Sequence, residues 1–199
     1  MYNVSPLLLK GAILVLEPNT GIPLNTINFE YNPETIKRSL KPQSVGDEPD
    51  RTEVLRLKGP PIETIQCEVE IDATDQLAAQ DPTAMSVGIA PQLSTLELLV
   101  YPSSAVLIAN EVLSLVGTIE ILPMSSNLTV FAWGTNRVTP VRLTGIEITE
   151  EFFDPRLNPI RAKVSLSMRV LNVNDVGFLT PAGALYMAYQ LSKESMAQQ

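Results

Sequence analysis

Alternation of apolar and polar residues predicts that strands make up most of this chain. In the clearest run, residues 62–72, four apolar side chains would share one face: Ile65, Cys67, Val69 and Ile71. Three further segments carry strand patterns: 128–133, 138–150 and 162–170. Residues 10–17 and 22–31 flank the turn sequence Pro-Asn-Thr-Gly and therefore predict a hairpin.

Wider, helical spacing of apolar residues is found in three segments. Residues 91–100 would place three leucines on one stripe: Leu93, Leu96 and Leu99. After Pro102, Ser103 or Ser104 can cap a second helical piece that runs through about Leu115. Its end is ambiguous, because residues 112–122 are also compatible with a strand. Residues 182–196 predict a last helix after a linker over 171–181.

Turn and breaker residues predict the connections between these elements. Asn32 as a cap and Pro33 at a first helical position indicate a short helix. Residues 41–52 hold prolines, a glycine and mixed charges, which predict an exposed, mobile loop. Gly-Pro-Pro at 59–61 is expected to break a strand, and residues 151–161 are expected to form an ordered loop.

These elements together predict an α+β fold in which β-structure dominates. The expected form is a barrel or sandwich with one or two inserted helices and a C-terminal helix. We expect residues 1–172 to form the β domain, and residues 173–199 to form a linker with a C-terminal helix and tail.

Composition narrows the possible functions without changing the fold. Of the 199 residues only 18% are charged and 45% are hydrophobic, which suits surfaces that become buried in partners. The net charge of −8 and the lack of a basic cluster argue against nucleic-acid binding. No stretch has about 18 apolar residues in a row, so no membrane insertion is expected. The first ten residues do not resemble a secretory leader, and we expect synthesis and assembly in the cytoplasm.

Residue types that carry catalysis are scarce. The chain has no histidine, which removes serine triads, most zinc sites and the usual base for a thiol. Cys67 is therefore expected to be a small core residue. No nucleotide-binding motif is present, and we expect no cofactor, no metal and no enzymatic activity.

One carboxylate cluster leaves an enzymatic alternative open. Its members are Glu147, Glu150, Glu151 and Asp154, next to Phe152 and Phe153. A lytic, carbohydrate-active enzyme could use Glu150 and Asp154 as its carboxylate pair. With 6% aromatic residues the sugar-binding cleft would be thinly furnished, and a solvated strand face that enters a loop is the favoured interpretation.

Two stretches resemble a known family. Residues 27–39 read INFEYNPETIKRS, and residues 130–171 contain an apolar strand ending in Trp-Gly, then FFDPRLNPIRA, then a last strand. Together they resemble the tube-like N-terminal domain of the baseplate protein of contractile injection systems, including antifeeding-prophage-like particles. Many members of that family continue into a LysM-like module. Residues 182–199 offer only a helix and tail, so peptidoglycan binding is not expected here.

This resemblance implies a tube-like β domain with a structural role. The chain would be a baseplate adaptor that forms a sixfold ring with copies of itself and joins the inner tube protein to the spike or hub protein and to other baseplate proteins. It would be part of a contractile particle that stays in the cell or is released. The residues that would form its interfaces lie in the matching stretches: Tyr31, Asn32, Pro33, Trp133, Phe153, Asp154, Arg156 and Arg161.

Alternatives stay open at this point. Within the same machine, the chain could be an inner tube protomer or a tube-end cap; outside it, a free-standing binding module that stays monomeric. Trp133 fits either a core position or an interface anchor. Asp154 fits either a subunit contact or an ion pair with Arg156 or Arg161 that holds its own loop.

Overall fold

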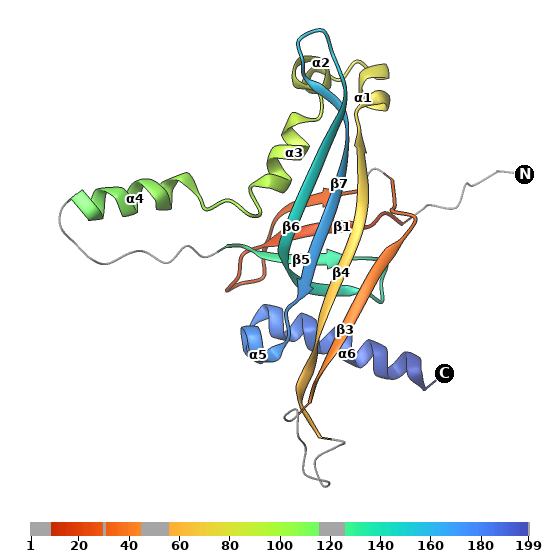
Figure 1. Cartoon of the computed structure of the whole chain (residues 1–199), viewed down its shortest axis with the longest axis vertical. Coiled ribbons are helices and arrows are strands. Elements are labelled where there is room, and N and C mark those ends of the chain that lie inside the picture. The colour runs from red at the N-terminus through yellow and green to blue at the C-terminus, as the bar shows by residue number, and fades with distance from the viewer. Residues whose placement is uncertain (1–8, 30, 45–55, 116–125, 199) are drawn as a thin grey trace, which may run out of the picture.

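The computed structural model describes residues 9–29, 31–44, 56–115 and 126–198. Its centre is one seven-stranded antiparallel sheet with the order β2-β1-β5-β6-β7-β4-β3. The strands are β1 (Ala12–Leu16), β2 (Pro23–Asn28), β3 (Ile36–Ser44), β4 (Leu57–Asp72), β5 (Leu128–Ala132), β6 (Val138–Phe153) and β7 (Pro159–Val170). In Figure 1 the sheet is strongly twisted, so that β1 and β5 cross the long strands at a steep angle.

The predicted α+β fold dominated by β-structure is confirmed, but the sheet is not closed into a barrel. Within the described residues, β2 and β3 are its two edges, and each has one pairing partner, β1 and β4 respectively. The expected hairpin of the first two strands is present, and the strand predicted over 62–72 is the C-terminal part of β4.

The prediction that Gly59, Pro60 and Pro61 break a strand is wrong, because β4 runs through all three. Pairing of β4 with β7 begins only at Thr64, so the prolines face a single neighbour, β3. That pairing itself shifts register between Lys41 and the residues after it. An irregular, one-sided ladder tolerates prolines, which cannot donate a backbone hydrogen bond.

Helices lie at the ends and on one side of the sheet (Figure 1). They are α1 (Thr74–Ala78), α2 (Pro82–Val87), α3 (Ala90–Glu97), α4 (Ser104–Leu115), α5 (Val173–Val176) and α6 (Pro181–Ala197). The helices predicted over 91–100, from 103 or 104 to 115, and over 182–196 are confirmed as α3, α4 and α6. The short helix predicted at Asn32 and Pro33 is wrong, because both residues are irregular and β3 follows directly.

Two predicted loops also differ from the structure. Residues 41–44 belong to β3, and residues 45–52 of that predicted loop lie outside the described residues. Residues 151–161 form the closed end of the β6–β7 hairpin, in which only residues 154–158 are outside the strands. The paired strands extend further than predicted because Glu151 pairs with Arg161, and Phe153 pairs with Pro159.

The core follows the period-two pattern. Alternate residues of β4 and β7 are buried, among them Ile65, Val164 and Met168, which are fully inaccessible to solvent. Cys67 is buried with them, and burial raises the pKa of its thiol to about 11, so its interpretation as a core residue is confirmed. Tyr186 of α6 packs into the same cluster. No helix among the described residues is long and apolar enough to cross a membrane.

Candidate interaction surfaces

Asp154 shapes the turn at the end of the β6–β7 hairpin. Its Oδ1 accepts hydrogen bonds from the backbone N of Arg156 at 2.7 Å and of Asn158 at 2.8 Å, and its Oδ2 accepts from Asn158 Nδ2 at 2.9 Å. The hydrogen bonds from Asn158, and then the one from Arg156, lower the pKa of Asp154. Asp154 therefore holds its own loop through Asn158 and the backbone of Arg156.

The hairpin turn is fixed to the neighbouring helices. Asn158 Nδ2 donates to the carbonyl O of Ser86 at 3.0 Å, and Ile89 N donates to the carbonyl O of Pro159 at 2.9 Å. Between them, Gly88 has a φ of +59°, and a Cβ there would lie 2.1 Å from the Pro159 carbonyl O. Only glycine allows this close approach of two backbones.

This anchored turn presents apolar side chains to solvent. Phe152 is 65% exposed, Phe153 51% and Leu157 80%. Phe152 and Leu157 also have positive φ angles of 51° and 67°, an unusual conformation for bulky residues. Apolar residues held outward on a fixed turn are typical of a surface that is covered by a partner. We call residues 152–157 the hairpin tip.

Arg161 lies below the hairpin tip and is held by two carboxylates of β4. Its Nη2 lies 2.5 Å from Glu70 Oε1 and its Nε lies 3.0 Å from Asp72 Oδ2. Burial of Asp72 raises its pKa, but the hydrogen bond from Thr74 and the charge of Arg161 outweigh this, so the pKa is lowered overall. Since Arg161 pairs with Glu70 and Asp72, it does not pair with Asp154, the partner that the sequence had left open.

Tyr31, Asn32 and Pro33 line a groove of about 490 Å³ against β4, together with Glu70. The Asn32 side chain holds this segment in place: Oδ1 accepts from Gly11 N at 2.8 Å, and Nδ2 donates to Leu9 O at 2.9 Å. The groove and the hairpin tip are thus connected through the Glu70–Arg161 ion pair. Seven of the eight predicted interface residues lie along this one path.

Trp133, the eighth, lies elsewhere, and the structure shows its core role while its role as an interface anchor stays a prediction. Its ring stacks on Phe131 with centroids 6.3 Å apart and packs against the core. It also lines a pocket of about 350 Å³ with three cations: Arg38, Arg137 and Lys193. Part of Trp133 is therefore core, and part is available to a partner.

Glu63 ties that pocket to the sheet and was not predicted as a functional residue. It is 3% exposed, and its Oε1 accepts from Arg38 Nη2 at 2.6 Å and from Tyr189 Oη at 3.0 Å, while Oε2 lies 3.2 Å from Lys193 Nζ. Burial raises the pKa of Glu63, but the hydrogen bond from Arg38 and the charge of Lys193 outweigh it, so the pKa is lowered. The network joins β3, β4 and α6.

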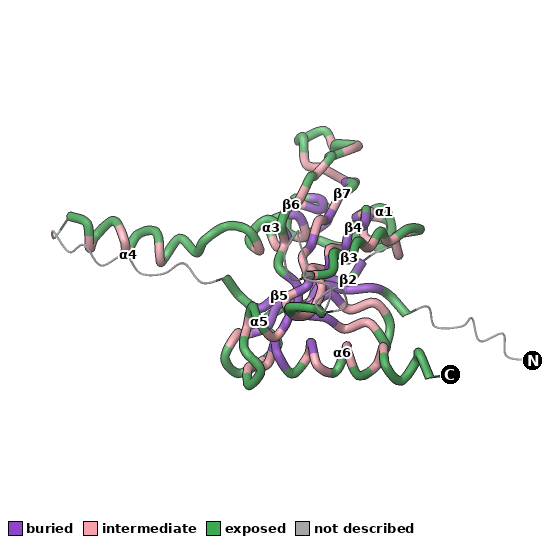
Figure 2. The backbone as a smooth tube through the Cα atoms, turned by 60° about the horizontal axis from the view of Figure 1, so that its bottom comes forward, coloured by how far each residue is buried: buried purple, intermediate pink, exposed green. Residues whose placement is uncertain are grey.

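Helix α4 contrasts with all other helices of eight or more residues, because it has no buried residue. It extends away from the sheet in Figure 1 and is largely exposed in Figure 2. Ile108 is 64% exposed, Val112 52% and Leu115 78%. These residues are spaced i, i+4 and i+7, so they form one apolar stripe along the helix. Sequence analysis predicted the helix but not its lack of cover.

The carboxylates proposed for catalysis are positioned by the hairpin. Glu150 pairs with Ala162 across the β6–β7 ladder, while Asp154 lies in the turn. A general acid for sugar cleavage needs a raised pKa, whereas the pKa of Asp154 is lowered by its hydrogen bonds. Within the described residues, no group of three or more acidic or cysteine side chains could hold a metal ion.

No family model matches the chain, and no curated protein matches it significantly.

Proposed function

We propose that this chain is a structural, ring-forming component of a phage-tail-like contractile injection machine. Within that class we assign it the role of baseplate adaptor, which joins the inner tube to the spike and to other baseplate proteins. The resemblance of residues 27–39 and 130–171 to the tube-like baseplate family supports this proposal. The tube-like arrangement would be completed by neighbouring copies, because the sheet of a single chain is open.

The observation that carries the proposal is the position of the uncovered apolar residues. Exposed apolar residues also occur on the sheet strands and before α6, among them Leu24, Leu57 and Leu179, but the hairpin tip and α4 each carry several of them on an element that projects from the sheet body. A ring subunit that also contacts other layers needs distinct contact surfaces on separate parts of the molecule. Large apolar side chains held away from their own core suit such permanent contacts.

The hairpin tip and the groove at Tyr31 would form the contact with another layer of the baseplate. Both are fixed by hydrogen bonds within the chain, at Asp154 and at Asn32. A surface that is already ordered loses little conformational entropy when it binds. We therefore assign the seven residues along this path to contacts with the tube, spike or baseplate proteins.

Protein stoichiometry in purified sheathed particles tests the proposal. An adaptor would be present as one ring of copies per particle, whereas an inner tube protomer would be present in numbers that grow with tube length. A tube-end cap would also form one ring, but at the tube end away from the baseplate, as labelling in electron micrographs would show. Absence of the chain from such particles would contradict every one of these roles.

A further inference from the structure

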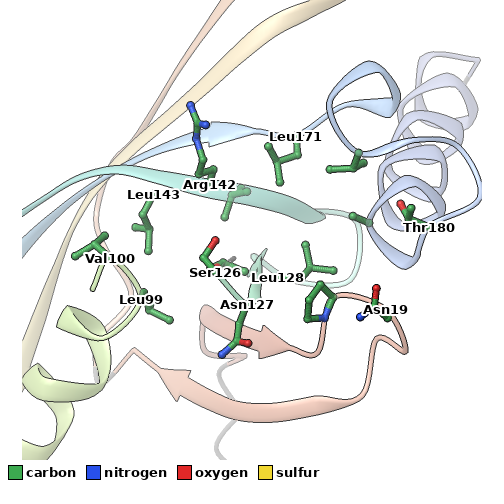
Figure 3. A pocket seen from close by; sticks show the side chains of 15 residues that line it. Asn19, Leu99, Val100, Ser126, Asn127, Leu128, Arg142, Leu143, Leu171 and Thr180 are labelled. Carbon is green, nitrogen blue, oxygen red and sulfur yellow. The ribbon is translucent and has the colours of Figure 1, made fainter. Parts of the chain in front are cut away.

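Helix α4 and a cavity elsewhere on the same chain have matching properties. The cavity has a volume of about 520 Å³, and its walls come from β5, β6, the start of α6, the residues that follow α3 and the turn between β1 and β2. Leu128, Leu143 and Leu171 supply much of its apolar surface in Figure 3. We call it the Leu128 cavity. Its size lies in the range of clefts that accept a compact group of side chains.

The charge on α4 is also complementary to the charge at the Leu128 cavity. Glu111 is the single charged residue of α4, and Arg142 is the single charged residue that lines the Leu128 cavity. Neither residue has an ion pair with another described residue. In Figure 3 the side chains of Arg142 and Leu143 extend to opposite sides of β6, so the guanidinium does not lie beside Leu143, and we place it at the rim of the proposed contact. A rim cation next to an apolar floor is the usual layout of a protein interface.

The helix does not fill the cavity of its own chain. Leu99 and Val100, which line the cavity, lie a few residues before the start of α4 at Ser104, and the helix then leads away from the sheet. Within the described residues, each chain therefore offers one helix with an exposed apolar stripe and one cavity with a partly apolar lining. Contacts between two different surfaces of identical chains repeat from copy to copy, and they close into a ring when the rotation allows.

We propose that α4 of one copy docks into the Leu128 cavity of the next copy, with the stripe Ile108, Val112 and Leu115 on the cavity floor. Glu111 then lies near Arg142 of the neighbouring copy. This inference rests on the proposed function, because it supplies the contact between ring subunits. It differs from that function in its test, which reports one contact and not the presence of the chain in particles.

Cysteine cross-linking tests the contact in the full-length chain. The doubly substituted chain Val112→Cys/Asn127→Cys has one thiol on α4 and one at the cavity, and the native Cys67 is buried with a raised pKa. A short bismaleimide should produce a ladder of covalent oligomers. A matched chain, Val112→Cys/Glu194→Cys, has its second thiol on α6 outside the cavity lining and should produce far less.

Two other results would overturn the inference. Cross-linked monomers without a ladder would mean that α4 folds back into its own cavity. No cross-link in either form would mean that a different partner covers α4. If either result is found while particles contain one ring of the chain, the docking contact fails and the proposed function stands. A ladder from a chain that is absent from particles would support the docking contact and contradict the proposed function.

Substitutions separate docking from folding. Ile108→Glu should weaken self-association on the order of 10- to 100-fold, because it removes one buried apolar side chain from the contact. Leu191→Glu, at an equally exposed apolar residue of α6, is the matched control and should leave self-association unchanged. Glu111→Arg should weaken it about two- to fivefold, and adding Arg142→Glu should restore it. Equal effects of Ile108→Glu and Leu191→Glu would contradict docking at α4.

Discussion

Ile65 and Ile108 are two isoleucines in opposite surroundings. Ile65 lies in β4 with no solvent exposure, and Ile108 lies in α4 with 64% exposure. The sheet and α6 bury a continuous cluster of apolar residues and pair the buried charge of Glu63, whereas α4 buries none of its residues. The comparison indicates that the packed core lies in the sheet body, and it is the reason why we propose that the apolar residues of α4 serve contacts outside the chain.

Truncating the two isoleucines is the most direct way to break this comparison. Ile65→Ala should lower the free energy of unfolding by about 2–5 kcal/mol, since it leaves a cavity in the packed core. Ile108→Ala should change it by less than about 0.5 kcal/mol. Urea denaturation of dilute protein measures both values. A large loss in Ile108→Ala under dilute conditions would show that α4 stabilises its own chain.

The glycine beneath the hairpin tip should give the next largest effect. Gly88→Ala places a Cβ against the Pro159 carbonyl O and requires a strained φ, which should cost about 2 kcal/mol or more. Thermal unfolding measures the loss, and binding of the proposed baseplate partners should fall with it because the tip is displaced. Ser86→Ala is a control, since the contact from Ser86 to the tip uses its backbone O. Wild-type stability of Gly88→Ala would contradict the anchoring of the tip.

The pH dependence of stability tests the contribution of the Glu63 network to the sheet body. Because the pKa of Glu63 is lowered in the folded chain, its contribution is complete above the ordinary value of 4.5 and is lost as pH falls through the lowered pKa. Glu63→Gln should cost about 1–2 kcal/mol at pH 7, because Arg38 and Lys193 lose their shared countercharge. It should also remove part of the acid sensitivity below pH 4.5. Urea titrations at pH 7 and at successively lower pH values check both effects, and identical pH profiles would contradict the network.

Smaller effects on stability than those at Ile65, Gly88 and Glu63 should come from the carboxylates of the hairpin. Asp154→Ala should reduce stability by about 1 kcal/mol and weaken assembly, because the turn loses its side-chain hydrogen bonds. Glu150→Ala should change little. Assays of wild-type protein on peptidoglycan and chitin oligosaccharides should show no turnover. Turnover that both substitutions abolish would replace the adaptor with the lytic enzyme.

The spacing of apolar residues predicted those helices and strands that depend mainly on residues close together in the sequence. The strands around Ile65 and Met168 and the helix ending at Leu115 follow from spacing alone. The strand break predicted from Gly-Pro-Pro at 59–61 is wrong. Whether a strand tolerates proline depends on the strand it pairs with, and the tertiary fold sets that pairing. Asn32 misled because its side chain bonds to Gly11 and Leu9, which are far away in sequence.

The same limit applies to the candidate surface residues, whose role in an interface stays a prediction. Those between Phe153 and Arg161 lie on one hairpin, so a contiguous stretch of sequence contains them. Glu63 was missed, although a signal was present: it falls on the same alternating face as Ile65 and Cys67, where a carboxylate needs partners. Those partners, Arg38 and Lys193, come from β3 and α6, and no spacing in the sequence brings them together.

The mass of the purified full-length chain, measured by native mass spectrometry over a range of concentrations, tests the central claim most directly. The account predicts one closed oligomer that contains a fixed number of copies, with the monomer appearing on dilution. A chain that stays monomeric up to high concentration, with the apolar residues of α4 still uncovered, would contradict it.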